Sequence, residues 1–290
     1  MAATTSFEKT FTIGGDLKVN RLGYGAMRIT GDGIWGPPKD KPEAIRVLQK
    51  AVELGINFID TADSYGPYIS EELIAEALYP YAKGLVIATK GGLTRSGPNA
   101  WSPNAKPAHL KEALEGSLKR LKRDSIDLYQ LHRIDAEVPF EKTLEFLKQA
   151  QDKGQIKHIG LSEVGVEQIK KAQQYVKIVS VQNMYSVDNR KWEPVLEYCE
   201  ANGLAFIPWY PLGGGNVKAL EKLNEIGKKH SATGHQVALS WLLHHSPNTL
   251  LIPGTSKVKH LEENVKAAAI SLTEEDLAEL EKIGAAEVSK

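Results

Sequence analysis

The architecture follows from one segment, Ile56-Asn57-Phe58-Ile59-Asp60-Thr61-Ala62-Asp63-Ser64-Tyr65-Gly66. An apolar run ends on an acid, and a short polar turn with a tyrosine and a glycine follows. This pattern predicts a buried strand that brings Asp60 and Tyr65 to the point where the chain leaves the core. Because side chains alternate along a strand, Asp60 shares a face with Phe58. If that face lines a barrel, Asp60 lies at its mouth.

The same pattern occurs twice more. Residues 85–89 form an apolar run that ends at Lys90, and residues 127–131 form another that ends at His132. Parallel strands present their carboxyl ends at one edge of a sheet or barrel. We therefore expect Asp60, Tyr65, Lys90 and His132 to converge.

Strand and helix patterns alternate along the chain at about 30 residues per unit, the size of one βα unit. Strands are predicted at residues 21–25, 56–60, 85–89, 127–131, 156–161, 178–182, 204–208 and 249–252. Helices are predicted at residues 42–54, 69–78, 107–121, 139–152, 165–175, 191–202, 217–229, 233–245, 258–268 and 273–283. Residues 7–19 read as a hairpin around Gly14-Gly15 that caps one end of the core. The pattern predicts an α/β fold, a (β/α)8 TIM barrel with an N-terminal β-hairpin and a C-terminal extra helix, as one domain over residues 1–290.

Composition narrows the possible partners. The chain has 36 basic and 36 acidic residues and 42% hydrophobic residues, so no charge excess attracts nucleic acid or a membrane. The start lacks a signal-peptide pattern, and no apolar run approaches a membrane span. With Cys199 as the single cysteine, we expect a cytoplasmic protein, and we expect a monomer. His244-His245 is interpreted as a surface pair near a helix end, so no metal site is predicted.

The four converging groups suit reduction of a carbonyl, in which an acid protonates the oxygen while hydride reaches the carbon. Tyr65 is the candidate acid, and a cation beside it at Lys90 stabilises its phenolate. Asp60 then holds the ammonium, and neutral His132 orients the carbonyl. Taken singly, each has a plain structural interpretation: a rim aromatic for Tyr65, an ion pair for Lys90 and Asp60, a core histidine for His132. Together they favour catalysis.

Asp60 with Tyr65, Lys90 after its strand, and Leu131-His132 resemble the tetrad of the aldo-keto reductases, NAD(P)H-dependent carbonyl reductases built on this barrel. The resemblance covers essentially the whole chain and implies the four catalytic roles just described. Gly160-Leu161-Ser162 and Val181-Gln182-Asn183 are similar to strand ends that hold the nicotinamide carboxamide. Trp209 takes the place of the aromatic residue that stacks on the nicotinamide. The cofactor-binding residues implied by the resemblance are Gly25, Met27, Ser162, Gln182, Trp209, Pro211, Leu212, Gly213, Gly254, Thr255, Ser256, Lys257, His260, Glu263 and Asn264.

This chain departs from the family pattern at three places. Glu163 stands where an asparagine often follows the serine, and Trp209 replaces a tyrosine. Gly254 and His260 replace strongly basic residues around the 2′-phosphate. Lys257, at the start of a predicted helix, supplies a positive charge that favours NADPH over NADH. The alternative is that Lys257 is solvated and that Ser256 and His260 hold the phosphate.

The sequence thus predicts NADPH-dependent reduction of aldehydes and ketones, with Trp35 and Trp101 from the long loops 26–41 and 91–106 as walls of the pocket for a small carbonyl substrate. A narrower alternative is a pyridoxal-type aldehyde reductase, because Tyr24-Gly25-Ala26-Met27 and Gly36-Pro37-Pro38 resemble the bacterial branch with such enzymes. An alternative of another class is a cofactor-sensing regulatory subunit.

Overall fold

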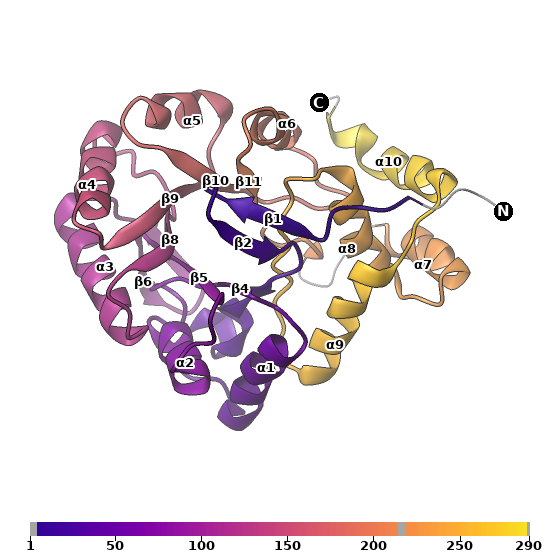
Figure 1. Ribbon diagram of the computed structural model, residues 1–290, viewed down its shortest axis with the longest axis horizontal. Helices are drawn as coiled ribbons and strands as arrows, with labels where there is room; N and C mark the ends of the chain where they lie inside the picture. Colours follow the sequence, from indigo (N-terminus) through magenta and orange to yellow (C-terminus); the bar gives the residue numbers. More distant parts are fainter. Residues whose placement is uncertain (1–4, 214–218, 289–290) are drawn as a thin grey trace.

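The computed structural model describes residues 5–213 and 219–288, and its central sheet is curled into a barrel with helices around it (Figure 1). All neighbouring strands of this sheet are parallel. In spatial order the strands are β3 (Tyr24–Gly25), β4 (Phe58–Asp60), β5 (Val86–Gly91), β8 (Ile126–Leu131), β9 (Ile156–Ser162), β10 (Ile178–Gln182) and β11 (Ala205–Phe206). Their spatial order is their order along the chain, as in a barrel of βα units.

The segment predicted as the eighth strand closes the barrel. Thr249 forms a parallel bridge with Phe206 at one edge of the sheet, and Leu251 forms one with Leu22 at the other. The Leu250 amide donates to the Phe206 carbonyl at 2.8 Å, and the Gly23 amide donates to the Leu251 carbonyl at 2.7 Å. The predicted (β/α)8 barrel is therefore confirmed, although this last strand is a short bridging segment.

Helices surround the barrel where the apolar periodicity predicts them. They are α1 (Lys41–Glu53), α2 (Ile69–Leu78), α3 (Pro107–Arg120), α4 (Phe140–Asp152), α5 (Val166–Gln173), α6 (Glu193–Ala201), α7 (Leu220–Lys229), α8 (Gly234–His245), α9 (Val258–Lys266) and α10 (Glu274–Val288). Side-chain caps fix the starts of α1 and α8: Asp40 caps α1 by accepting from the Glu43 amide at 2.9 Å, and Thr233 and Gln236 form a capping box on α8. Of the helix predicted at residues 217–229, residues 217 and 218 lie outside the described part.

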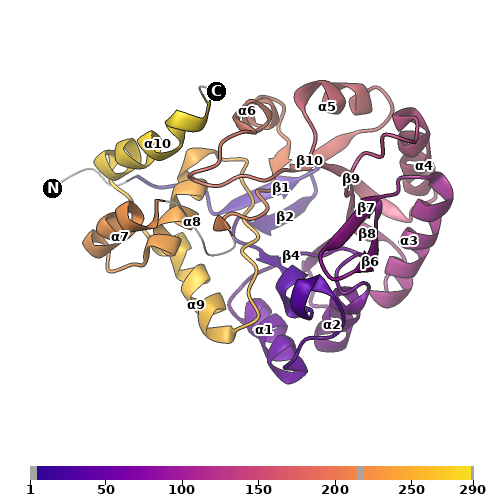
Figure 2. The same ribbon diagram turned by 180° about the vertical axis from the view of Figure 1, so that it is seen from behind.

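The predicted N-terminal hairpin is present and seals one end of the barrel. It consists of β1 (Thr10–Ile13) and β2 (Leu17–Asn20). Its buried residues Ile13 and Val19 pack against inward-facing strand residues such as Phe58 and Leu128. Figure 1 shows this hairpin across the near end of the barrel, and Figure 2 shows a second hairpin at the opposite end. The N-terminal hairpin therefore covers the end of the barrel opposite the carboxyl ends of the strands.

The second hairpin lies in residues 91–106, which the sequence analysis treats as a loop. It is formed by β6 (Leu93–Gly97) and β7 (Ala100–Pro103), and its turn places Asn99 at a positive φ of 56°. The loop prediction was wrong here because the hairpin buries only Leu93 and so shows no apolar alternation. Loop 26–41 likewise contains two 3-10 turns, η1 (Ala26–Ile29) and η2 (Asp32–Ile34), and a third, η4 (Ala267–Ala269), follows α9.

The C-terminal helix α10 lies outside the ring of helices, beside α7 and α8 (Figures 1 and 2). It extends to residue 288, beyond the predicted end at 283. No helix in the described ranges is long and apolar enough to cross a membrane. That residues 1–290 form one domain stays a prediction.

Candidate active site

Inward-facing side chains change from apolar to polar at the carboxyl ends of the strands, and there Lys90 lies between two of the predicted partners. Its Nζ donates to Asp60 Oδ1 at 2.5 Å, to the Thr61 carbonyl at 2.9 Å and to the Tyr65 hydroxyl oxygen at 3.2 Å. Lys90 is 0% exposed and Asp60 2% exposed. The fold therefore joins an acid, a cation and a phenol in one buried chain of hydrogen bonds.

The second oxygen of Asp60 is also occupied. Asp60 Oδ2 accepts hydrogen bonds from Gln130 Nε2 and from Gln182 Nε2, each at 2.9 Å. These bonds fix the carboxylate that faces Lys90, since a buried ion pair requires its remaining lone pairs to be satisfied. Gln130 was missed by the sequence analysis, although it lies two residues before His132 and so shares its inward face. Gln182 is predicted to bind the cofactor, but its side-chain Nε2 donates to Asp60.

The environment keeps Tyr65 protonated at neutral pH. Burial raises the pKa of the Tyr65 hydroxyl, and Lys90 offsets part of this rise by stabilising the phenolate. Burial lowers the pKa of the Lys90 ammonium, but Asp60 and Tyr65 outweigh that effect and the net pKa is raised. Tyr65 thus carries a proton with a permanent cation at its oxygen, the state that a proton donor requires.

His132 is neutral. Burial and the nearby cations Lys90, Arg133 and Arg95 hold the pKa of its imidazole well below the ordinary value. Its Nδ1 lies 3.3 Å from Ser64 Oγ, and its ring meets the Tyr65 ring edge-on with centroids 5.9 Å apart. A neutral imidazole next to a phenol can offer a hydrogen bond without competing as a strong acid.

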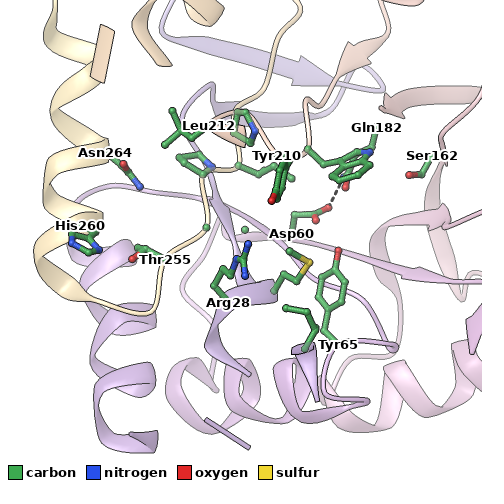
Figure 3. A pocket seen from close by; sticks show the side chains of 18 of the residues that line it. Arg28, Asp60, Tyr65, Ser162, Gln182, Tyr210, Leu212, Thr255, His260 and Asn264 are labelled. Carbon is green, nitrogen blue, oxygen red and sulfur yellow. Dashed lines mark hydrogen bonds between the residues drawn. The ribbon is translucent and has the colours of Figure 1, made fainter. Parts of the chain in front are cut away.

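Asp60, Tyr65, His132 and Gln182 line a cavity of about 1010 Å³. Figure 3 shows Asp60 and Tyr65 near Gln182 and Ser162 on one side, His260 and Asn264 on the helix α9 side, and Arg28 between them. Such a volume is at the upper end for small-ligand sites. It therefore exceeds what a small carbonyl compound alone would fill.

Most of the predicted cofactor-binding residues line this cavity. They are Gly25, Met27, Ser162, Gln182, Trp209, Pro211, Leu212, Gly254, Thr255, His260, Glu263 and Asn264. Gly25 and Gly254 also have a structural reason to be glycine: a Cβ on Gly25 would lie 2.5 Å from the Ile252 carbonyl oxygen, and one on Gly254 would lie 2.9 Å from that of Gly25. Gly213 is not among the lining residues.

Ser256 and Lys257 line a neighbouring cavity of about 510 Å³ instead of the main one. The helix start expected to receive a phosphate is partly engaged. The Val258 amide donates to Glu43 Oε1 at 3.1 Å, and the Lys257 amide donates to Thr255 Oγ1 at 3.1 Å. An acid from α1 therefore accepts the hydrogen bond of the first amide of α9.

Glu163, the residue that departs from the family pattern, faces Trp209. Its Oε1 accepts from the Trp209 indole Nε1 and from the Met184 amide, each at 2.6 Å. A carboxylate is an acceptor only, so it suits two N–H donors. Glu163 thus fixes the indole that lines the cavity.

The two predicted pocket tryptophans differ in place. Trp101, on β7, lines the cavity, and its ring lies edge-on to Tyr65 at 6.3 Å between centroids. Trp35 is not among the residues that line this cavity: residue 35 pairs with Gly66 in a backbone bridge, and its ring lies 5.7 Å from the Arg95 guanidinium.

Two arginines in the cavity were missed by sequence reasoning. Arg28 lines both cavities. Arg133 Nη1 donates to the His132 carbonyl at 2.6 Å and to Ser162 Oγ at 3.0 Å. Arg133 follows His132 directly, so its position was a usable signal, whereas Arg28 lies in a loop without periodicity. In the described part of the chain, no group of three or more His, Cys, Asp or Glu side chains is placed to hold a metal ion.

The aldo/keto reductase family model matches residues 21–285, so the chain belongs to the aldo/keto reductase family and is an oxidoreductase. This confirms the resemblance found in the sequence. The chain is 55% identical to an uncharacterized oxidoreductase of Schizosaccharomyces pombe, over 95% of this chain and 90% of the relative. It is 43% identical to the pyridoxine 4-dehydrogenase of Escherichia coli, over 94% of this chain and 98% of the relative.

Solved structures of aldo-keto reductases also resemble the structure of this chain. A thermostable aldo-keto reductase in complex with the inhibitor epalrestat superposes with a TM-score of 0.85 at 33% identity, covering 95% of this chain and 99% of that one. An aldo/keto reductase from Klebsiella pneumoniae, solved with NADP and acetate, has a TM-score of 0.81 at 25% identity, covering 95% of both chains.

Proposed function

We propose that this protein reduces aldehydes and ketones to alcohols with NADPH, using Tyr65 as the proton donor. One observation carries the proposal: the buried Lys90 ammonium lies between Asp60 Oδ1 and the Tyr65 hydroxyl, 2.5 Å and 3.2 Å away, at the mouth of a large cavity. A phenol is a weak acid, and a fixed cation lowers the cost of its deprotonation during the reaction.

The residues around the cavity fit a nicotinamide dinucleotide. Trp209 offers an aromatic face held by Glu163, and Ser162 lines the same end. Arg28, in the middle of the cavity, and His260, on α9, would donate hydrogen bonds to the phosphates of the cofactor. When bound, NADPH supplies the hydride. The structure from Klebsiella pneumoniae with NADP supports this cofactor, and NADH is the less favoured one.

In this mechanism the carbonyl oxygen lies between the Tyr65 hydroxyl and the neutral His132 imidazole. His132 donates a hydrogen bond that orients the oxygen, and Tyr65 transfers its proton as negative charge builds there. Lys90 stabilises the phenolate that remains, and Asp60, held by Gln130 and Gln182, keeps the ammonium in place. We keep the monomeric state and the cytoplasmic location as predictions.

A narrower candidate is reduction of a pyridine aldehyde of the pyridoxal type. Two observations favour it: the 43% identity to the pyridoxine 4-dehydrogenase and the aromatic Trp101 beside Tyr65 and His132. The planar pyridine ring of such a substrate can pack against the Trp101 indole.

The test is a panel of carbonyl compounds, including pyridoxal, benzaldehyde, butanal and acetone, with NADPH consumption followed by absorbance. Reactions without carbonyl and reactions with NADH are the controls. The proposal predicts multiple turnovers that depend on the carbonyl and run faster with NADPH. Tight NADPH binding without turnover on any carbonyl would instead support a cofactor-sensing regulatory subunit.

A further inference from the structure

The Arg95 guanidinium, on β6, is unusual because each of its five N–H groups has a backbone carbonyl as acceptor. A guanidinium has five donors in a fixed fork. Nε donates to Ala100, Nη1 to Ile34 and Ser64, and Nη2 to Gly33 and Gly97, at 2.9, 2.7, 2.8, 2.9 and 3.2 Å respectively. One side chain therefore satisfies carbonyl groups of the η2 loop, of the turn after β4 and of the β6–β7 hairpin.

These three segments form the wall of the cavity beside the reacting groups. Gly33, Ile34, Tyr65 and Trp101 all line the cavity. The segments are far apart in sequence, since Arg95 lies 61 residues from Ile34 and 31 residues from Ser64. Loops of this kind move relative to one another unless tied. Arg95 is the tie.

Arg95 also supports Trp101. The guanidinium carbon lies 3.5 Å from the centre of the Trp101 ring, so the two planes are in stacking contact. The indole in turn lies edge-on to Tyr65, at 6.3 Å between centroids, and to His132, at 6.5 Å. The stack therefore holds the indole in one orientation next to the proton donor.

A second line of contact runs from Arg95 to His132 through Ser64. Arg95 fixes the Ser64 carbonyl at 2.8 Å, and the Ser64 hydroxyl oxygen lies 3.3 Å from His132 Nδ1. The partner of Nδ1 determines which ring nitrogen carries the proton toward the cavity. Without the hydrogen bond from Arg95, Ser64 holds the tautomer of His132 less firmly.

We propose that Arg95 is a positioning residue that determines substrate specificity: it holds Trp101 and the Ser64–His132 pair so that planar aromatic aldehydes are preferred over aliphatic ones. The proposal rests on the proposed carbonyl reduction. Arg95 itself does not touch the reacting atoms in this account, and acts through Trp101 and His132.

The test compares Arg95→Lys and Arg95→Ala with wild type, using benzaldehyde and butanal with NADPH. Lysine keeps the charge but lacks the planar fork, so it cannot make five bonds or stack. For benzaldehyde we expect kcat/KM to fall about 10- to 100-fold in both variants, mainly through a higher KM, as lost stacking and hydrogen bonds imply. For butanal, which loses the Ser64 support of His132 but has no aromatic ring to contact Trp101, we expect the smaller fall in kcat/KM, less than about threefold. NADPH affinity should also change by less than about threefold.

Arg123→Lys is the matched control. Arg123 also lies over an aromatic ring, that of Tyr81 at 4.6 Å, and donates to a backbone carbonyl, that of Leu85 at 3.2 Å, but it lies before β8 at the other end of the barrel. Its replacement should leave the benzaldehyde-to-butanal ratio unchanged. Methylguanidinium added to Arg95→Ala should partly restore the benzaldehyde rate, which a general loss of structure would not allow.

Two results in the Arg95 variants would overturn the proposal. One is an unchanged benzaldehyde-to-butanal ratio of kcat/KM, and the other is a loss of NADPH affinity that parallels the loss of kcat/KM. Turnover by the wild type distinguishes a failure of the proposed carbonyl reduction from a failure of the role proposed for Arg95. A wild type that reduces no carbonyl overturns the proposed function and this proposal with it, whereas an active wild type with insensitive Arg95 variants overturns this proposal alone.

Discussion

Raising the pH above neutrality is expected to destabilise the fold through one residue, His245 at the end of α8. The sequence suggests a surface pair at His244-His245, but His245 bridges two elements: Nε2 lies 2.8 Å from Glu193 Oε1 on α6, and Nδ1 lies 3.0 Å from Glu281 Oε1 on α10. Its side chain is 14% exposed and its ring stacks on Trp241 at 4.3 Å. The charged imidazolium thus ties α10 to the barrel.

The magnitude follows from linkage. Burial lowers the pKa of His245, but the hydrogen bonds and charges of Glu193 and Glu281 outweigh burial and raise it to about 9. A group whose pKa is raised on folding stabilises fully below its unfolded pKa, about 6.5, and loses that contribution as the pH rises through 9. The difference between the unfolded and folded pKa values corresponds to about 3 kcal/mol of unfolding free energy. We expect about 2–3 kcal/mol, because solvent screens the half-exposed Glu281.

The assay is urea unfolding of wild type and of His245→Gln at several pH values between about 6.5 and 9.5. Wild type should lose about 2–3 kcal/mol of unfolding free energy more than His245→Gln over this range. His244→Gln is the matched control, because the hydrogen-bond acceptors that His244 faces within the described residues are the backbone carbonyls of Ser240 and Thr5, not carboxylates. It should follow wild type. An identical pH dependence in wild type and His245→Gln would refute the reasoning.

Three further predictions concern the site. In Lys90→Met the fall of the reduction rate at high pH should move to higher pH, because Lys90 lowers the pKa of Tyr65; a kcat/KM profile that does not move excludes this role. Glu163→Ala should weaken NADPH binding about tenfold by freeing Trp209, whereas Glu163→Gln, which keeps an acceptor oxygen, should stay within about threefold in a fluorescence titration. Lys257→Ala should weaken NADPH up to about tenfold and NADH hardly at all, since Lys257 is exposed and lies near Glu43; equal effects would remove Lys257 from recognition of the 2′-phosphate.

The barrel and the four central groups could be predicted because both follow from local patterns. Strand alternation places Asp60, Lys90 and His132 on inward faces at one end of successive strands, and Tyr65 lies five residues beyond Asp60. The same alternation contains Gln130, whose hydrogen bond to Asp60 we did not anticipate. Local periodicity was sufficient wherever the partners were successive strands.

Other features depend on contacts between distant loops, and the sequence has no periodic signal for them. Arg95 reaches carbonyl groups from separate segments, and its hairpin lacks an apolar pattern. Trp35, predicted as a wall of the substrate pocket, is absent from the cavity lining, and its ring lies next to the Arg95 guanidinium. Glu163 turns to Trp209, 46 residues away. Such side-chain directions are set by tertiary packing.

The most direct test of the account is the turnover of Tyr65→Phe, with NADPH binding measured in parallel. Phenylalanine keeps the ring but removes the hydroxyl that lies 3.2 Å from Lys90 Nζ. We expect NADPH affinity to change little and turnover of the best carbonyl substrate to fall by roughly 10²- to 10⁴-fold, the scale of losing a general acid. A variant that binds NADPH and turns over at the wild-type rate would contradict the central claim that Tyr65 donates the proton.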